Sequence, residues 1–424
     1  MVSRSMTKDL SPGERAFIAS SVRSAVDLVF AHWISAPRFD LDERYRQLLD
    51  TTLTRGDRRR FSLEMAAFLA ALQNGHTKYC DAIGWRPYAG ALGFEVAPVD
   101  SAWVITKAWR PGFRAGQVLE RVDGGSPEDL YQESKRYISA SSERGRRRRL
   151  FAETHLFPRR LRLQVDGRRM VLGRTPGVWD APREGTTGKW LDRGRVAYLR
   201  IPSFREPEHE QRALGLVRRF RRAPALVIDV RGNTGGSDPD RLIESLMDRP
   251  WRGMAVSTTQ HIGSVRAYAH LLEMADQRRG PGLHVSRDQL ASLEVFRAWD
   301  HFQLLVPPKV NPPRPGAYAG RVLLLADEAC GSACEDFLIP FKNSGRGSLV
   351  GTTTDGTTGQ PYILDLPKGI QACVGAKRTS FPDGSPFEGT GIAPDHEVRA
   401  TRDDLLEGRD PALEMATELA TRTR

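Results

Sequence analysis

The sequence predicts an α/β fold, because short buried strands alternate with helical patterns over its second half. The apolar runs at residues 225–230 and 322–325 have the length and composition of strands covered on both faces. A charged amphipathic pattern over residues 205–221 precedes the first run, and an apolar helical spacing over residues 333–341 follows the second. A helical pattern at the N-terminus and a β-rich pattern after it complete the expected architecture.

Length and composition set the broad class. A chain of 424 residues is expected to form two or three domains, and 40% hydrophobic with 27% charged residues is ordinary for a globular protein. The net charge of +11 is mostly arginine, with a dense run at residues 144–149. Because aromatic residues are not interleaved with this run, we interpret it as a solvated face or loop and do not favour a nucleic-acid partner.

The sequence favours a cytoplasmic protein. It has no run of eighteen apolar residues, so no membrane span is expected, and its polar first fifteen residues do not resemble a signal peptide. Four cysteines in so long a chain do not suggest a disulfide framework. An incorrectly assigned start codon would hide an export signal, and a homo-oligomer stays open.

Residues 1–82 form the first expected domain, which is helical. Ser11 and Glu14 resemble a capping box, and residues 61–72 have the composition of a second helix. The helical pattern ends at Gly75, which places His76 just beyond a helix end. Taken alone, His76 is most simply a surface histidine near a cap.

Residues 83–175 form the second expected domain, which is β-rich, with strands at 91–96, 103–107, 118–122 and 161–165. The sequence Ala-Leu-Gly-Phe at 91–94 and the Asp-Gly turn at 123–124 resemble a PDZ domain. This resemblance implies that the loop of Leu92, Gly93 and Phe94 binds a peptide C-terminus through backbone N–H groups, while the peptide pairs with a strand edge. A small β-domain that acts only as a spacer or lid is the alternative.

Residues 176–424 form the third expected domain and carry two glycine-containing motifs. The strand at 225–230 ends in polar residues and then Gly235 and Gly236, which allow backbone N–H groups to approach a ligand oxygen as an oxyanion hole requires. A phosphate-binding loop is disfavoured because the Walker lysine is absent. Ser332 follows the strand at 322–325 and begins a helix, where free N–H groups favour developing negative charge. An ordinary helix cap is the commoner use of such a serine.

Three further elements are expected toward the C-terminus. The turn-rich loop at 382–395 carries Glu388, although loop carboxylates are usually only solvated. Helices are expected at 265–277 and 403–419.

Together, the motifs at 229–236, 331–335, 351–356 and 388–395 resemble the serine peptidase family of C-terminal processing (tail-specific) proteases and the tricorn core. The four motifs occur in the family's order between about residues 195 and 398. The resemblance implies a ClpP/crotonase-like α/β core without a cofactor. It also implies that Ser332 is the nucleophile and that the N–H of Ala333, with one from Gly235 or Gly236, forms the oxyanion hole.

The catalytic base distinguishes two branches of this family. The processing branch carries a lysine where this chain has Thr357, so a Ser–Lys dyad is not expected. The tricorn-like branch uses an upstream histidine and a downstream glutamate, which match His76 and Glu388. Such enzymes carry a serine just before the histidine, where this chain has Gly75. Glu388 is expected to orient His76 directly or through a hydroxyl such as that of Thr77.

The resemblance implies a serine endopeptidase that cleaves unfolded or C-terminal segments of polypeptides. The alternative is a non-catalytic ligand- or peptide-binding protein on the same fold. A zinc site of His76, Cys80, Cys330 and Cys334 has suitable residue types, but small buried packing residues explain the cysteines better, so no metal is expected.

Overall fold

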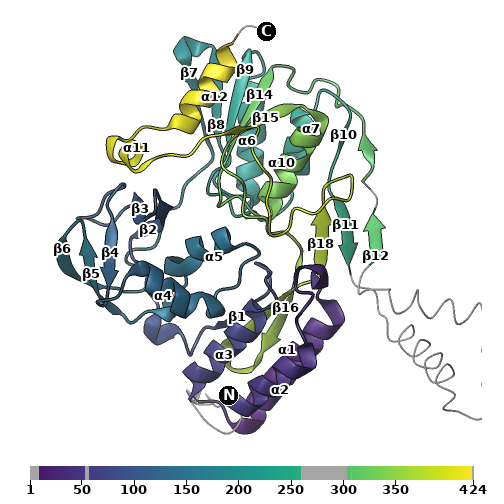
Figure 1. Cartoon of the computed structure of the whole chain (residues 1–424). Coiled ribbons are helices and arrows are strands. Elements are labelled where there is room, and N and C mark those ends of the chain that lie inside the picture. Colours follow the sequence, from purple (N-terminus) through teal and green to yellow (C-terminus); the bar gives the residue numbers. More distant parts are fainter. Residues whose placement is uncertain (1–8, 53–56, 259–302, 307, 423–424) are drawn as a thin grey trace, which may run out of the picture.

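The computed structural model describes residues 9–52, 57–258, 303–306 and 308–422. Figure 1 shows N-terminal helices at one end, a β-rich group beside them and a larger α/β group at the other end. The helix expected at residues 265–277 lies outside the described residues. Within the described ranges, no helix is long and apolar enough to cross a membrane.

The α/β group is built on a six-stranded sheet in the order β19-β15-β14-β9-β8-β7. Its strands are β7 (Thr187–Leu191), β8 (Val196–Arg200), β9 (Ala225–Asp229), β14 (Arg321–Ala326), β15 (Gly347–Gly351) and β19 (His396–Glu397). Neighbouring strands are parallel except for β7, which runs antiparallel to β8. The two apolar runs that predicted buried strands are β9 and β14, which confirms the α/β prediction for this part of the chain.

Helices cover both faces of this sheet (Figure 1). One face packs against α6 (Pro207–Arg219), α7 (Asp240–Leu246) and α10 (Ala333–Ser344), and the other against α12 (Pro411–Thr421). The single helix expected at 403–419 is wrong, because α11 (Arg402–Glu407) and α12 are separate. Gly408 ends α11 with φ of 68°, and Pro411 begins α12.

The strand that follows the N-terminal helices pairs with a distant part of the chain. These helices are α1 (Pro12–Val29), α2 (Leu41–Thr52) and α3 (Arg58–Ala70), and the capping box of Ser11 and Glu14 is confirmed. After α3, β1 (Lys78–Asp81) pairs with β17 (Ile370–Gly375), which pairs with β16 (Pro361–Leu366). This pairing brings the segment just before β1 against the loops of the α/β group.

A buried ion pair fastens α3 to β1. Arg58 and Asp81 are 4% and 0% exposed, and Arg58 Nη2 donates to Asp81 Oδ1 over 2.6 Å. Arg58→Met should lower the free energy of unfolding by about 3–5 kcal/mol, because it leaves a buried carboxylate without its positively charged partner. The exposed pair of Arg23 and Asp42 provides a control, since Arg23→Met should cost less than about 1 kcal/mol. Urea unfolding compares the two variants, and equal costs would contradict this account.

Residues 83–175, called here the inserted segment, form two small sheets. One holds β2 (Phe94–Val99) and β3 (Ala102–Ala108), and the other β4 (Leu119–Val122), β5 (Arg160–Val165) and β6 (Arg168–Gly173). Two helices, α4 (Pro127–Ser134) and α5 (Glu143–Arg149), accompany them.

The remaining strands lie outside the inserted segment. They are β10 (Trp251–Arg252), β11 (Ala255–Thr258), β12 (Gln303–Val306), β13 (Val310–Asn311) and β18 (Lys377–Ser380).

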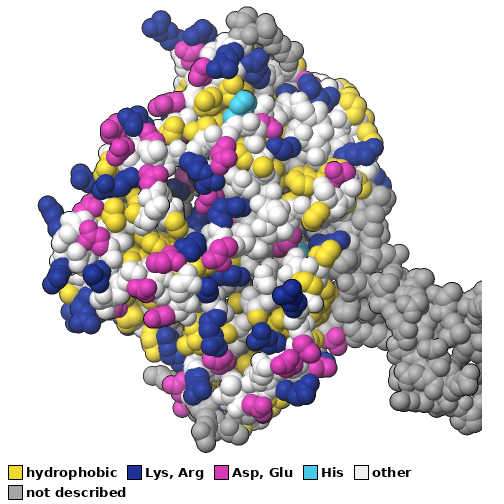
Figure 2. All heavy atoms as spheres, in the orientation of Figure 1, with side chains coloured by type: hydrophobic (Ala, Val, Ile, Leu, Met, Phe, Trp, Pro, Cys, Tyr) yellow, Lys and Arg dark blue, Asp and Glu magenta, His cyan; other side chains and the backbone are white. Residues whose placement is uncertain are grey.

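The arginine run at 144–149 is not simply a solvated face. It forms α5, where Arg147 pairs with Glu128 over 2.7 Å and Arg149 pairs with the buried Asp355 over 2.8 Å. The second pair joins the inserted segment to the α/β group. On the face shown in Figure 2, Lys and Arg side chains are interspersed with Asp and Glu rather than gathered in one patch.

Candidate active site

Ser332 lies at the sharp turn between β14 and α10. Its backbone has φ of 56° and ψ of −131°, a conformation that costs energy for a non-glycine residue and is commonest at functional sites. Two contacts hold the turn. The Ser332 N–H donates to the Thr357 carbonyl over 2.7 Å, and Gly235 packs so closely that a Cβ there would lie 2.7 Å from the Ser332 Cβ.

His76 faces this serine from the segment before β1. Its Nε2 lies 3.1 Å from Ser332 Oγ, and its Nδ1 lies 3.2 Å from Thr357 Oγ1. The backbone N–H of His76 donates to Asn74 Oδ1 over 3.1 Å, which fixes the residue beyond the end of α3. Burial lowers the pKa of His76 to about 3, so its imidazole is neutral at neutral pH and can accept a proton.

Glu388 lies behind the histidine and is buried. Its oxygens accept hydrogen bonds from Ser141 Oγ (2.5 Å), Asn74 Nδ2 (2.9 Å) and the Thr358 N–H (2.9 Å). Burial raises the pKa of Glu388 to about 8, against the opposing effect of these three donors. Among the described residues, no direct hydrogen bond joins Glu388 to His76.

The hydroxyl of Thr77 does not link the glutamate to the histidine. It donates to Asn74 Oδ1 over 2.8 Å and accepts from the Gly375 N–H over 2.9 Å. Two other hydroxyls lie between Glu388 and His76, those of Ser141 and Thr357, whose oxygens are 3.0 Å apart. Sequence reasoning missed Ser141, because nothing in the local sequence marks it.

Two backbone N–H groups beside Ser332 are free of protein acceptors in the described part of the chain, those of Gly236 and Ala333. The Gly235 N–H instead donates to Asn233 Oδ1 over 2.9 Å. A Cβ on Gly235 would lie 2.8 Å from the Ala333 nitrogen, so the glycine turn and the start of α10 are in close contact. Of the three residues proposed for an oxyanion hole, Gly236 and Ala333 thus have unused donors.

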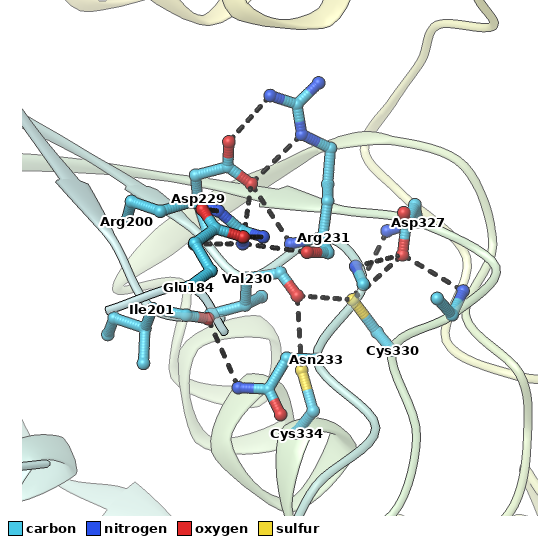
Figure 3. A network of polar contacts seen from close by, with 12 residues as sticks. Glu184, Arg200, Ile201, Asp229, Val230, Arg231, Asn233, Asp327, Cys330 and Cys334 are labelled. Atoms are coloured by element: carbon cyan, nitrogen blue, oxygen red, sulfur yellow. Dashed lines mark hydrogen bonds and ion pairs between the residues drawn. The ribbon is translucent and has the colours of Figure 1, made fainter. Parts of the chain in front are cut away.

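Figure 3 shows polar contacts around the end of β9 and the residues on either side of the serine turn, Cys330 and Cys334. Cys330 Sγ donates to the Val230 carbonyl over 3.1 Å, and Asn233 Nδ2 donates to the Ile201 carbonyl over 3.3 Å. Arg231 pairs with the buried Asp229 over 2.6 Å at the end of β9. These contacts fix the end of β9 relative to the start of α10.

The four residues of the zinc alternative are not assembled as ligands. Cys330 and Cys334 are buried and both approach the Val230 carbonyl, whereas Cys80 is exposed on β1. Across the described residues, no group of three or more His, Cys, Asp or Glu side chains is arranged to hold a metal ion.

The Leu92, Gly93 and Phe94 loop borders a groove of about 630 Å³ between the inserted segment and the α/β group. Leu92 and Phe94 line this groove, as do Arg148 of α5 and Ala329, three residues before Ser332. The Gly93 carbonyl accepts the N–H groups of Trp109 and Arg110. The N–H groups of Leu92 and Gly93 have no protein acceptor within the described residues.

Comparisons with known proteins find similar sequences and folds. The sequence model of peptidase family S41 matches residues 195–398. A protein of Streptomyces coelicolor named as a tricorn protease homolog is 26% identical over 366 residues, covering 79% of this chain and 26% of the relative. The chain therefore spans about a quarter of that relative's length.

Solved structures share the fold at low identity. The crystal structure of mature CPAF matches with a TM-score of 0.70 and 17% identity over 96% of both chains. The photosystem II D1 C-terminal processing protease matches with a TM-score of 0.53 and 17% identity, over 93% of this chain and 96% of that one. At these identities the likeness establishes a mixed α/β fold of the kind found in these proteins.

Proposed function

Because residues 195–398 match the sequence model of peptidase family S41, we propose that this chain is a serine endopeptidase with Ser332 as nucleophile and His76 as general base. The 3.1 Å contact between His76 Nε2 and Ser332 Oγ carries the proposal. A neutral imidazole in this position can take the serine proton during attack on a peptide carbonyl and return it to the leaving amine. Unlike the alternative of a non-catalytic binder, this role uses the strained backbone of Ser332.

The other polar groups of the site have roles in the same reaction. The N–H groups of Gly236 and Ala333 would stabilise the tetrahedral oxyanion, since neither has an acceptor among the described residues. Gly235 would keep the two donors close together by allowing the tight contact with Ser332. Glu388 would stabilise the imidazolium that forms on His76.

We further propose that the inserted segment is a PDZ-like domain that binds the C-terminus of an unfolded polypeptide substrate. The free N–H groups of Leu92 and Gly93 would hold the terminal carboxylate, and Phe94 begins the strand beside which the peptide would lie. The groove extends from this loop to Ala329, close in sequence to Ser332. A substrate held there by its end would have its chain directed toward the catalytic serine.

Amidation of the substrate's C-terminus tests this binding mode. A peptide substrate with an amidated end should have a KM about 10- to 100-fold higher than the free acid, because hydrogen bonds to a charged group are lost. Gly93→Ala should abolish this preference, since a Cβ there would lie 2.5 Å from the Arg110 Cβ. Gly112→Ala is the matched control, because Gly112 also has positive φ but faces open space. Equal KM values for the two peptides would contradict the proposal.

The pH dependence of kcat/KM should reflect Glu388 rather than an ordinary histidine. His76 is protonated only as pH falls through about 3, so no loss of activity is expected near pH 6.5. Glu388 loses its proton as pH rises through about 8, and its carboxylate then stabilises the imidazolium, so kcat/KM should rise through that range. Glu388→Gln should remove this rise. Two results would contradict this prediction. One is a pH dependence of kcat/KM that is unchanged in Glu388→Gln, and the other is a fall in wild-type kcat/KM as pH drops through about 6.5.

A further inference from the structure

We propose that Ser141 of the inserted segment is a positioning residue for His76, acting with Thr357 in a chain of hydroxyls that ends at Glu388. This inference rests on the proposed peptidase function and adds a structural requirement to it. The inserted segment would then supply part of the active site in addition to any role in binding substrate.

When Glu388 is ionised, the hydroxyl protons of this series can be assigned from the lengths of its contacts. Ser141 has one hydroxyl proton, and its contact with Glu388 Oε1 (2.5 Å) is shorter than its contact with Thr357 Oγ1 (3.0 Å). Ser141 therefore donates to the carboxylate and accepts from Thr357. The Thr357 proton is then committed to Ser141, so Thr357 Oγ1 accepts from the Nδ1–H of His76 over 3.2 Å.

With Glu388 ionised, this arrangement sets the tautomer of His76. With the proton on Nδ1, the Nε2 atom presents its lone pair to Ser332 Oγ, as a general base requires. When His76 becomes positively charged, each hydroxyl in the chain can strengthen its donation toward Glu388, so the carboxylate stabilises the imidazolium without touching it.

The Thr357 side chain occupies the space that a side chain at residue 75 would need. A Cβ on residue 75 would lie 2.4 Å from Thr357 Oγ1, closer than two such atoms can approach. A serine before the histidine and a threonine at 357 therefore compete for the same space. The Gly75 N–H also donates to Ser141 Oγ over 2.8 Å, which helps to hold that hydroxyl in place.

Several contacts fix Ser141 against the α/β group. The next residue, Ser142, donates to the Asp355 carbonyl over 3.0 Å and caps α5 by accepting from the Gly145 N–H. Arg149 at the other end of α5 donates to Asp355 Oδ2 and to the Ser139 carbonyl. The loop before α5 is thereby tied to the same loop that carries Thr357.

Removal of single hydroxyls tests whether Ser141 and Thr357 connect Glu388 to His76. Ser141→Ala and Thr357→Val should each lower kcat by about 10- to 1,000-fold with little change in KM, because the base loses its orientation while the binding groups remain. Thr357→Ser keeps the hydroxyl and should retain most activity. Ser139→Ala is the matched control, since its side chain lies in the same buried segment and makes no hydrogen bond within the described part of the chain.

The pH profile separates positioning from a merely structural role. Ser141→Ala should also lose the rise in kcat/KM near pH 8, because Glu388 is then disconnected from His76. If Ser141→Ala keeps both the kcat and the pH profile of Ser139→Ala, or if Thr357→Ser is as impaired as Thr357→Val, the hydroxyl chain is wrong. Labelling of wild-type Ser332 by a fluorophosphonate tests the peptidase function separately, because it does not depend on these variants.

A double substitution tests the competition at residue 75. Gly75→Ser alone should lower both stability and activity, because the new side chain overlaps Thr357. Combining Gly75→Ser with Thr357→Ala should restore stability and give a higher kcat than Thr357→Ala alone, because a hydroxyl returns to that space. Wild-type stability and activity in Gly75→Ser alone, or no gain in the double variant, would overturn the inference.

Discussion

Ser332→Ala should lower kcat/KM for peptide hydrolysis by at least about 10⁴-fold, because the reaction loses its nucleophile. The substitution removes one half-buried hydroxyl and keeps the hydrogen bond from the backbone N–H of residue 332 to the Thr357 carbonyl, so the fold should persist. Hydrolysis of an unfolded polypeptide with a free C-terminus, followed by mass spectrometry, measures the loss.

Ser344→Ala is the control for this substitution. Ser344 lies at the other end of α10, where its hydroxyl donates to the Pro340 carbonyl, and its loss should leave kcat/KM unchanged. Wild-type cleavage by Ser332→Ala would show that another residue performs the attack.

His76→Ala should cause a loss of similar size, at least about 10³-fold, because no other base among the described residues lies within hydrogen-bond distance of Ser332 Oγ. The fold losses of the two single variants should not multiply in the double variant. Once either residue is gone, the double variant Ser332→Ala/His76→Ala should be scarcely less active than the worse single variant, since the two side chains act as one unit.

His209→Ala controls for the loss of a histidine elsewhere. His209 lies on α6 and contacts Thr186 rather than the candidate site, so its removal should not change kcat/KM. Losses that simply multiply in the double variant would contradict a shared mechanism for Ser332 and His76.

Much of the α/β group could be predicted from the sequence because its signals are local. The apolar runs of β9 and β14 need only strand-length hydrophobicity, and the small residues around Ser332 need only a sharp turn. Likewise, Ser11 and Glu14 cap α1 through contacts three residues apart. The contact between His76 and Ser332 was expected only from the order of family motifs, since 256 residues separate them.

Other features depend on contacts that no local pattern records. Ser141 is an ordinary serine in sequence, and it reaches Glu388 only because α5 is tied to Asp355. The arginines of α5 look like a solvated run until their partners, Glu128 and Asp355, are located. The sequence predicts that Glu388 orients His76 directly or through a hydroxyl such as that of Thr77. The Thr77 hydroxyl instead bonds Asn74 and Gly375.

Labelling with a fluorophosphonate probe, read by intact mass and peptide mapping, tests the central claim most directly. The account predicts one adduct on Ser332 in the wild type, a sharply slower reaction in His76→Ala and none in Ser332→Ala. A folded wild-type protein that remains unlabelled, or an adduct at a different residue, would contradict the assignment of Ser332 as a histidine-activated nucleophile.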